Sequence, residues 1–177
     1  MSDVEDLYRR TAPELLGYLV RRVRVREDAA DLLAELYLLA WRRRDALPAP
    51  PDDRLWLFGA ARRLVLAHHR DEVRRHAAAS DLRELLAVAP APQDASDEPD
   101  PRVRRALAAL PEPDRELLTL TVWEGLTPAQ AAAIAGIRPG AARVRLHRAR
   151  RRLASALGSA DPESVAAALP RPTVNGL

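Results

Sequence analysis

The stretch TPAQAAAIAGIRPGAARVRLHRARRRLASAL, residues 127–157, decides the fold of the second half of the chain. Thr127 followed by Pro128 is a typical helix start, because the hydroxyl can cap the helix and proline suits its first turn. Gly136 can adopt the left-handed conformation that ends a helix in a tight turn, and Pro139 is placed to begin a second, longer helix. This order predicts a helix-turn-helix.

The second helix of this motif is strongly basic, with seven Arg residues and no acid between Arg138 and Arg152. In a DNA major groove, such a helix brings its first turn near base edges while its later Arg residues hold phosphates. A solvated basic helix at the end of a bundle has the same charge, but it does not require a cap, a turn and a proline at this spacing. The core between the two helices is expected to contain Ala132, Ile134, Ile137 and Leu146.

Proline-rich segments divide the chain around this motif. Residues 87–101, AVAPAPQDASDEPDP, are acidic and nearly devoid of bulky apolar side chains, so we expect a flexible linker. The predicted domains are residues 1–86 and 102–157, followed by a tail, 158–177, with a short helix at about 161–169. Helices are expected at 4–23, 27–44, 55–75 and 80–86 in the first domain, and at 101–110, 114–123, 127–135 and 139–157 in the second.

The composition favours an all-α protein of two small helical domains. Of its 177 residues, 47% are hydrophobic and only seven are Gly, while Ala, Leu and Arg dominate. The sequence has no cysteine, which excludes disulfides, thiolate metal sites and a cysteine nucleophile. The acidic N-terminus and the lack of a long apolar run predict neither export nor membrane insertion, and hence a cytoplasmic protein.

Charge is segregated along the chain, although the formal net charge is only +3. Residues 102–157 carry 11 Arg against four acids, whereas residues 81–101 carry one Arg against six acids. A basic module behind an acidic connector is typical of a protein that meets phosphates with one segment. All 28 basic residues are Arg, which also suits a GC-rich bacterial genome.

Residues 110–157, LPEPDRELLTLTVWEGLTPAQAAAIAGIRPGAARVRLHRARRRLASAL, closely resemble region 4 of the extracytoplasmic function (ECF) RNA polymerase sigma factors of the sigma-70 superfamily. The resemblance runs without a gap through the LP start, the EGL and AGI turns and the basic tail. In that family this domain reads the minus 35 promoter element and docks on the flap of the polymerase beta subunit. The resemblance implies DNA contacts by Arg138, Gly140, Ala141, Arg143, Val144, Arg145, His147 and Arg148.

Two segments of the first domain resemble sigma region 2: LYRRTAPELLGYLVRRV, residues 7–23, and EDAADLLAELYLLAWRR, residues 27–43. Asp31 and Glu35 are four residues apart and share a helix face, which suits docking on a basic surface. Ion pairing with nearby Arg residues is the simpler alternative for these acids. In the family this helix binds the clamp helices of the polymerase beta prime subunit, which implies polymerase contacts by Asp31, Leu32, Glu35 and Leu36.

The next segment, RLWLFGAARRLVLAHHRDEVRR at residues 54–75, resembles the helix that reads and melts the minus 10 element in the family. Strand opening needs a basic helix along the backbone and a loop that captures an unstacked base. We expect the loop 47–54 to be the loop that captures an unstacked base. We expect Trp41 and Trp56 to pack in the core. The resemblance implies minus 10 DNA contacts by Arg54, Arg62, Arg63, His68, Arg70, Arg74 and Arg75.

No catalytic or cofactor-binding constellation accompanies these motifs. His68 and His69 raise the question of a metal site, but adjacent helical residues point to different sides. We also find no carboxylate at ligand spacing from them. We therefore predict no metal, no cofactor and no enzymatic activity.

Taken together, the resemblance implies a sigma factor that binds core RNA polymerase, recognises and melts promoter DNA in the nucleoid, and starts transcription. An anti-sigma factor is a further expected partner, and the acidic linker would thread the active-site channel of the polymerase. Two other classes stay open at this point: a conventional helix-turn-helix regulator, and a module that sequesters a partner. The resemblance to sigma region 2 distinguishes a sigma factor from a conventional regulator, whereas in vitro transcription with core polymerase separates all three classes.

Overall fold

The computed structural model describes residues 4–86, 101–159, 161–162 and 169, without the side chains of 78–86 and 101. Within these residues the chain forms seven α-helices and one short 3-10 turn, Arg44–Ala46, and contains no strand. The chain divides into two compact units, Met1–Ser96 and Asp97–Leu177. The predicted all-α class is confirmed, whereas the predicted linker and most of the tail helix lie outside the described residues.

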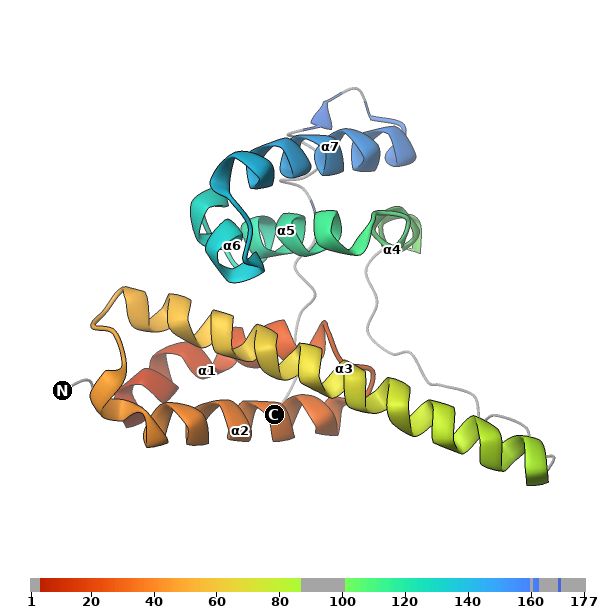
Figure 1. Ribbon diagram of the computed structural model, residues 1–177. Helices are drawn as coiled ribbons and strands as arrows, with labels where there is room; N and C mark the ends of the chain where they lie inside the picture. Colours follow the sequence, from red (N-terminus) through yellow and green to blue (C-terminus); the bar gives the residue numbers. More distant parts are fainter. Residues whose placement is uncertain (1–3, 87–100, 160, 163–168, 170–177) are drawn as a thin grey trace. The chain divides into compact units, whose positions relative to one another are not determined.

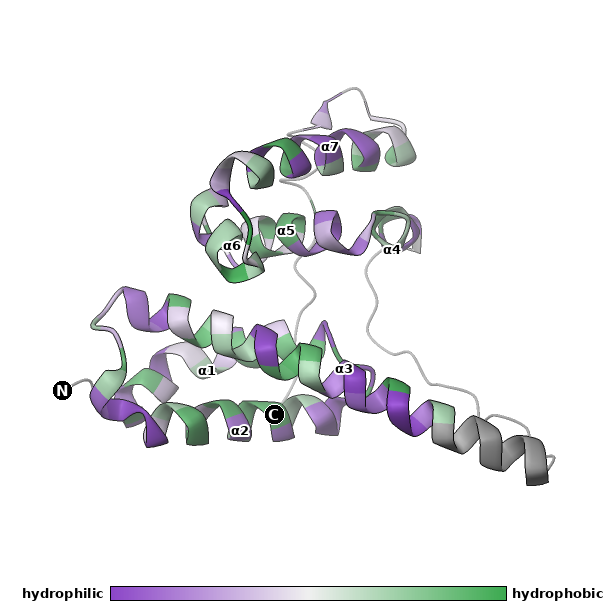
Figure 2. Ribbon diagram, in the orientation of Figure 1, coloured by the Kyte–Doolittle hydropathy of each residue, from purple (hydrophilic) through white to green (hydrophobic). Residues whose placement is uncertain are grey.

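The first unit contains α1 (Val4–Val20), α2 (Arg26–Arg42) and α3 (Asp52–Leu86), which pack against one another (Figure 1). Apolar residues recur every three or four positions along the helices, and this spacing places them on the sides that face the core (Figure 2). In that core the rings of Tyr18 and Phe58 meet edge to face, with centroids 5.4 Å apart. The fully buried larger side chains of this unit are Leu7, Leu15, Tyr18, Leu19, Leu36, Leu57 and Phe58.

The observed bounds of helix α3 differ from the predicted helix boundaries in this part of the chain. We expected one helix over 55–75 and a second over 80–86, but the backbone is helical without a break from Asp52 to Leu86. The segment after Arg75, HAAASDLRELL, contains no Gly or Pro and is rich in good helix formers, so nothing in it stops the helix. At 35 residues, α3 is about 52 Å long, and it continues past the ends of α1 and α2 (Figure 1).

Two polar contacts join α1 to the other two helices. Thr11 donates a hydrogen bond to the Leu7 carbonyl (2.6 Å), and its oxygen lies 2.6 Å from the Tyr37 hydroxyl. A threonine hydroxyl has a single proton, so Tyr37 must be the donor in the second bond. Nearby, Arg10 pairs with Asp53 (3.0 Å), whose side chain is only 1% exposed. These bonds fix α1 against both α2 and α3.

We expect Tyr37→Phe to lower the free energy of unfolding by about 1 kcal/mol at neutral pH, because the buried Thr11 oxygen loses its donor. Burial raises the pKa of Tyr37 from 10.0 to about 12. The unfolded state therefore loses this proton first, so the contribution of Tyr37 is complete below pH 10 and declines as the pH rises toward 12. Urea unfolding of both proteins at neutral pH and near pH 11 measures the difference. It should shrink at the higher pH, and a constant difference would contradict the assignment.

The second unit contains α4 (Pro101–Ala108), α5 (Glu112–Val122), α6 (Pro128–Ala135) and α7 (Pro139–Leu157). Helix α7 packs on the other three helices, and α5 also contacts α6 (Figure 1). As predicted, Ala132, Ile134 and Leu146 are buried, whereas Ile137 stays half-buried. No helix among the described residues is both long and apolar enough to cross a membrane.

Candidate nucleic-acid and polymerase interfaces

The turn between α6 and α7 has the geometry that the sequence predicts. Thr127 Oγ1 accepts a hydrogen bond from the Gln130 N–H (3.2 Å), and Gln130 Oε1 accepts one from the Thr127 N–H (2.9 Å). This capping box begins α6. Gly136 ends α6 at φ 70°, and the Ile137 N–H donates to the Ala132 carbonyl (3.0 Å). These bonds fix the direction in which the chain enters α7.

Helix α7 has a buried apolar face and an exposed basic face. Ala142, Leu146, Ala149 and Leu153 follow one another at spacings of four and three and are buried against the rest of the unit. Arg145 is half-buried. The other seven residues predicted to contact minus 35 DNA are all exposed: Arg138, Gly140, Ala141, Arg143, Val144, His147 and Arg148.

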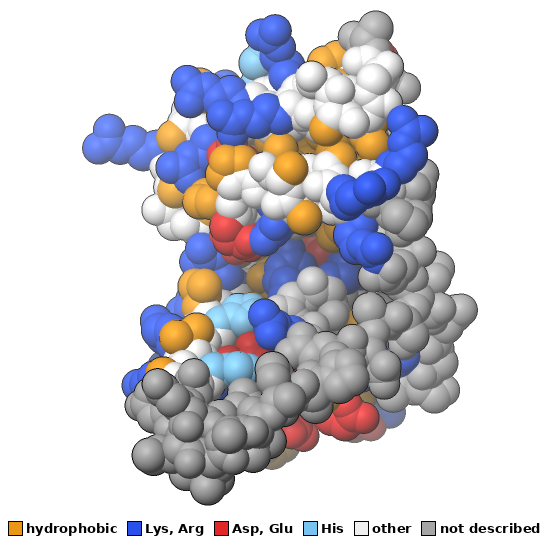
Figure 3. Space-filling model, turned by 90° about the vertical axis from the view of Figure 1, so that its right-hand side faces the viewer, with side chains coloured by type: hydrophobic (Ala, Val, Ile, Leu, Met, Phe, Trp, Pro, Cys, Tyr) orange, Lys and Arg blue, Asp and Glu red, His pale blue; other side chains and the backbone are white. Residues whose placement is uncertain are grey.

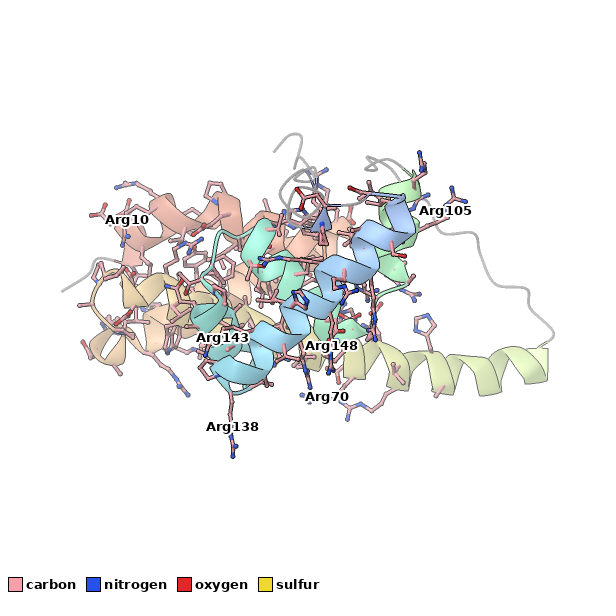
Figure 4. The ribbon with its side chains drawn as sticks, turned by 90° about the horizontal axis from the view of Figure 1, so that it is seen from above. Arg10, Arg70, Arg105, Arg138, Arg143 and Arg148 are labelled. Carbon is pink, nitrogen blue, oxygen red and sulfur yellow. The ribbon has the colours of Figure 1, made fainter. Side chains whose placement is uncertain are left out.

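The Arg residues of α7 do not all have the same role. Arg138, Arg143 and Arg148 form no ion pair with any residue that the structure describes, and Arg138 projects from the first turn of the helix (Figure 4). Arg152 instead pairs with Asp114 of α5 at 3.1 Å, and that carboxylate is only 12% exposed. Arg side chains also stand out over the face of this unit seen in Figure 3. One of the seven Arg residues of this basic segment is therefore engaged inside the unit and joins α7 to α5.

Helix α3 presents a smaller basic surface than predicted. Arg63, Arg70 and Arg75 are exposed and form no ion pair within the described part of the chain, and Arg62 is half-buried. Arg74 is exposed but paired with Asp71. The predicted minus 10 contacts on α3 that stay exposed are therefore Arg63, Arg70, Arg74 and Arg75.

Two of the predicted minus 10 residues are engaged by acidic residues of the first unit. Arg54 forms a bidentate salt bridge with Glu14 of α1. Its Nε and one terminal nitrogen each lie 2.8 Å from a carboxylate oxygen of Glu14. Its guanidinium also lies 4.9 Å from the centre of the Phe58 ring. The His68 side chain is only 12% exposed and faces Asp28 of α2. His68 is too buried to contact DNA, which corrects that prediction. The Arg54 side chain is 33% exposed and held by Glu14, and its contact with DNA stays a prediction.

The predicted base-capturing loop 47–54 is shorter than expected, because α3 already begins at Asp52. Asp53 is buried against Arg10, and its Oδ1 accepts a hydrogen bond from the Arg54 N–H (2.7 Å). Leu47 and Pro48 are half-buried. Only the three residues 49–51 stay exposed between the 3-10 turn and α3.

The outer face of α2 separates the predicted polymerase contacts into two groups. Asp31 and Glu35 are exposed, as a docking surface requires. Leu32 and Leu36 are 7% and 0% exposed, so they anchor the helix in the core and cannot offer contact area to a partner. This corrects the prediction for the two leucines.

The sequence reasoning missed two apolar residues on this face. Leu38 is 48% exposed and Trp41 is 54% exposed, which corrects the prediction that Trp41 packs in the core. Trp56, with the same prediction, is half-buried. Glu35, Leu38 and Trp41 follow one another at intervals of three, a spacing that keeps them close on one side of the helix. This spacing was the available signal.

The sequence prediction on metals rested on a premise that the structure contradicts. Glu72 is four residues after His68, and its Oε2 lies 3.8 Å from His68 Nε2. Asp28 approaches the same nitrogen from α2, at 3.5 Å. Carboxylates are therefore present at ligand spacing from His68.

Comparisons with known proteins agree with this arrangement. The family model of sigma-70 region 2 matches residues 7–75, and that of sigma-70 region 4 matches residues 101–153. RNA polymerase sigma factor CarQ of Myxococcus xanthus is 35% identical over 166 residues, covering 90% of this chain and 91% of the relative. ECF RNA polymerase sigma factor SigF of Caulobacter vibrioides is 34% identical over 153 residues, covering 83% and 81%.

Solved structures show the same fold. The sigma factor RpoE of Bartonella quintana, crystallised with the anti-sigma factor NepR, matches with a TM-score of 0.68 and 23% identity, covering 91% of this chain and all of that one. CnrH, solved with the cytosolic domain of CnrY, matches with a TM-score of 0.61 and 25% identity over 89% of each chain. With both regions matched and relatives aligned over nearly their full length, the chain belongs to the ECF group of the sigma-70 family of RNA polymerase sigma factors.

Proposed function

We propose that this sigma factor binds core RNA polymerase through the outer face of α2 and reads promoter DNA with α7 and the exposed Arg residues of α3. The observation that carries the proposal is the presence of both sigma regions in one chain, with acidic residues exposed on α2 and Arg residues exposed on α3 and α7. A conventional helix-turn-helix regulator requires only α4 to α7, and region 2 has no use in it. The reaction chemistry belongs to the polymerase, and this chain acts without catalysis, in the cytoplasm.

The polymerase-binding face combines two kinds of contact. Asp31 and Glu35 supply negative charge that steers association with the basic clamp helices of the beta prime subunit. Leu38 and Trp41 supply apolar area, and exposed aromatic residues of this kind are frequent anchors of protein interfaces. We propose all four as polymerase contacts, with Leu32 and Leu36 holding the helix in place from below.

The DNA-binding surfaces divide the promoter between the two units. On α7, the exposed stripe from Arg138 to Arg148 suits the major groove of the minus 35 element, with Arg143 and Arg148 in contact with bases or phosphates. On α3, Arg63, Arg70 and Arg75 suit the backbone of the minus 10 element. We expect an anti-sigma factor to cover one or more of these surfaces, since RpoE, which shares the fold, was crystallised in complex with the anti-sigma factor NepR.

In vitro transcription with purified core polymerase tests the proposal. A library of genomic fragments is transcribed with and without the chain, and permanganate footprinting detects melted DNA on the selected templates. We expect transcripts and open complexes only when the chain is present. Duplex binding without polymerase recruitment would favour a conventional regulator, and polymerase binding without any open complex would favour a sequestering module.

We expect Arg143→Ala and Arg148→Ala each to weaken binding to a selected minus 35 duplex by about 1–3 kcal/mol. If the lost contact is to a phosphate, the slope of log K against log salt also falls by ~0.9. Fluorescence anisotropy over a range of salt concentrations measures both quantities. Arg9→Ala, which removes an exposed Arg from α1, is the matched control and should bind like the wild type.

A further inference from the structure

A histidine and two carboxylates converge between α2 and α3 in the first unit. His68 Nε2 lies 3.5 Å from Asp28 Oδ2 and 3.8 Å from Glu72 Oε2. One ligand atom from each of the three residues lies within 4.8 Å of the other two. Histidine side chains beside acidic ones are visible on the face of this unit shown in Figure 3. No role in polymerase or promoter binding accounts for this group.

The geometry is that of a preformed ligand set. His68 and Glu72 are four residues apart on α3 and therefore share one helix face, and Asp28 faces them from the first turn of α2. In a tetrahedral zinc site, with metal–ligand distances of 2.0–2.2 Å, neighbouring ligand atoms are roughly 3.4 Å apart. The distances from His68 Nε2 are already close to that value, so small side-chain rotations suffice.

The surroundings of His68 favour a cation over a simple hydrogen bond. Its Nε2 is buried and makes no hydrogen bond to any part of the chain that the structure describes, although two carboxylates lie at ion-pair distance. The side chains of His68, Glu72 and Asp28 are 12%, 16% and 33% exposed. Water therefore screens the cluster only partly, while an ion can still reach it from the Asp28 side.

We propose that Asp28, His68 and Glu72 form a binding site for a divalent transition-metal ion, with Zn²⁺ as the best match to one imidazole and two carboxylates. The three protein ligands leave a fourth position for water, as in open zinc sites. His69 Nδ1 lies 3.3 Å from Glu72 Oε2 and orients that carboxylate from outside the ligand set. The bound ion clips the start of α2 to the middle of α3, and so links the helix that carries Asp31 to the helix that carries Arg70.

The test uses the full chain without a histidine tag, after treatment with a chelator. Zn²⁺ is added during thermal unfolding followed by circular dichroism, and its affinity is measured by competition with a chromophoric chelator. We expect one bound ion per chain and a rise in Tm of about 5–10 °C at a free Zn²⁺ concentration ten times the Kd. Mg²⁺, which prefers oxygen ligands alone, should give no comparable rise.

Isosteric variants distinguish the site from other places where zinc binds. Asp28→Asn and Glu72→Gln should each weaken Zn²⁺ binding more than tenfold, because loss of even an outer-shell partner costs 10–100-fold. Glu27→Gln and Asp71→Asn change an exposed acid next to each ligand and should bind like the wild type. Equal affinity in all four variants overturns the proposal, and so does a rise in Tm that Asp28→Asn retains. Far-UV circular dichroism without zinc confirms that each variant is folded.

Discussion

The double charge reversal Asp31→Arg and Glu35→Arg is expected to lower the affinity of the chain for core RNA polymerase by about two orders of magnitude. Both side chains are exposed on α2, so the fold does not depend on them. Each substitution removes a negative charge and places a positive one opposite a basic partner surface, and like charges across an interface cost several kcal/mol. Surface plasmon resonance with immobilised core polymerase measures the loss, and transcription should fall with it.

The control for this experiment makes the same change of charge elsewhere in the first unit. Glu5→Arg and Asp6→Arg alter two exposed acids of α1 that pair with Arg9. This variant should stay folded, since weak surface pairs contribute little to stability. It should also retain nearly full affinity for core polymerase, because the two residues lie on α1 and not on the proposed docking face of α2. If both double variants lose affinity equally, net charge and not the α2 face controls binding, and the proposed docking surface is wrong.

The second large effect is expected on the stability of the DNA-reading unit. Leu146 is 2% exposed on the buried face of α7, and Leu146→Ala leaves a cavity there that should cost about 2–5 kcal/mol. Because domains of this size are stable by only ~3–9 kcal/mol, the variant loses much or most of the stability of the second unit. Hydrogen exchange should show faster exchange of the α5, α6 and α7 amides, and affinity for the minus 35 duplex should fall with it.

The matched control lies two residues earlier on the same helix. Val144 is 50% exposed, so Val144→Ala should change stability by less than about 0.5 kcal/mol. Its exchange rates should stay at the wild-type values. Comparable losses in both variants would show that Leu146 is not packed as the structure places it.

Local chemistry made the second unit predictable from its sequence. The cap at Thr127, the turn at Gly136 and the proline at position 139 each act through neighbouring residues, so α6 and α7 begin and end where the sequence indicated. The end of α3 was missed for the opposite reason. No residue between Arg75 and Leu86 stops a helix, so no local signal marked how far α3 extends.

The side-chain environments of the first unit depend on contacts between distant segments. The spacing of His68 and Glu72, four residues apart on α3, was visible in the sequence and was overlooked. Asp28 is 40 positions from His68 and meets it only because α2 packs on α3, so sequence spacing could not reveal this third member of the cluster. Trp41 was expected in the core because the sequence pattern placed it on an apolar helix face, yet it is 54% exposed on the outer side of α2, with the Arg44 guanidinium 5.5 Å from the centre of its ring. Likewise, the partner of Arg54 on α1 is set by tertiary packing.

The unbroken course of α3 has a consequence for how this chain tolerates change. Residues of the core, such as Val65, and residues of the basic surface, such as Arg70, lie on one continuous helix. Inserting or deleting one residue between them rotates everything downstream by about 100° and shifts it by about 1.5 Å. The direction in which the basic residues point relative to the core is therefore set by the number of residues between them. Insertions or deletions there are tolerable only when their length is close to a whole number of helical turns.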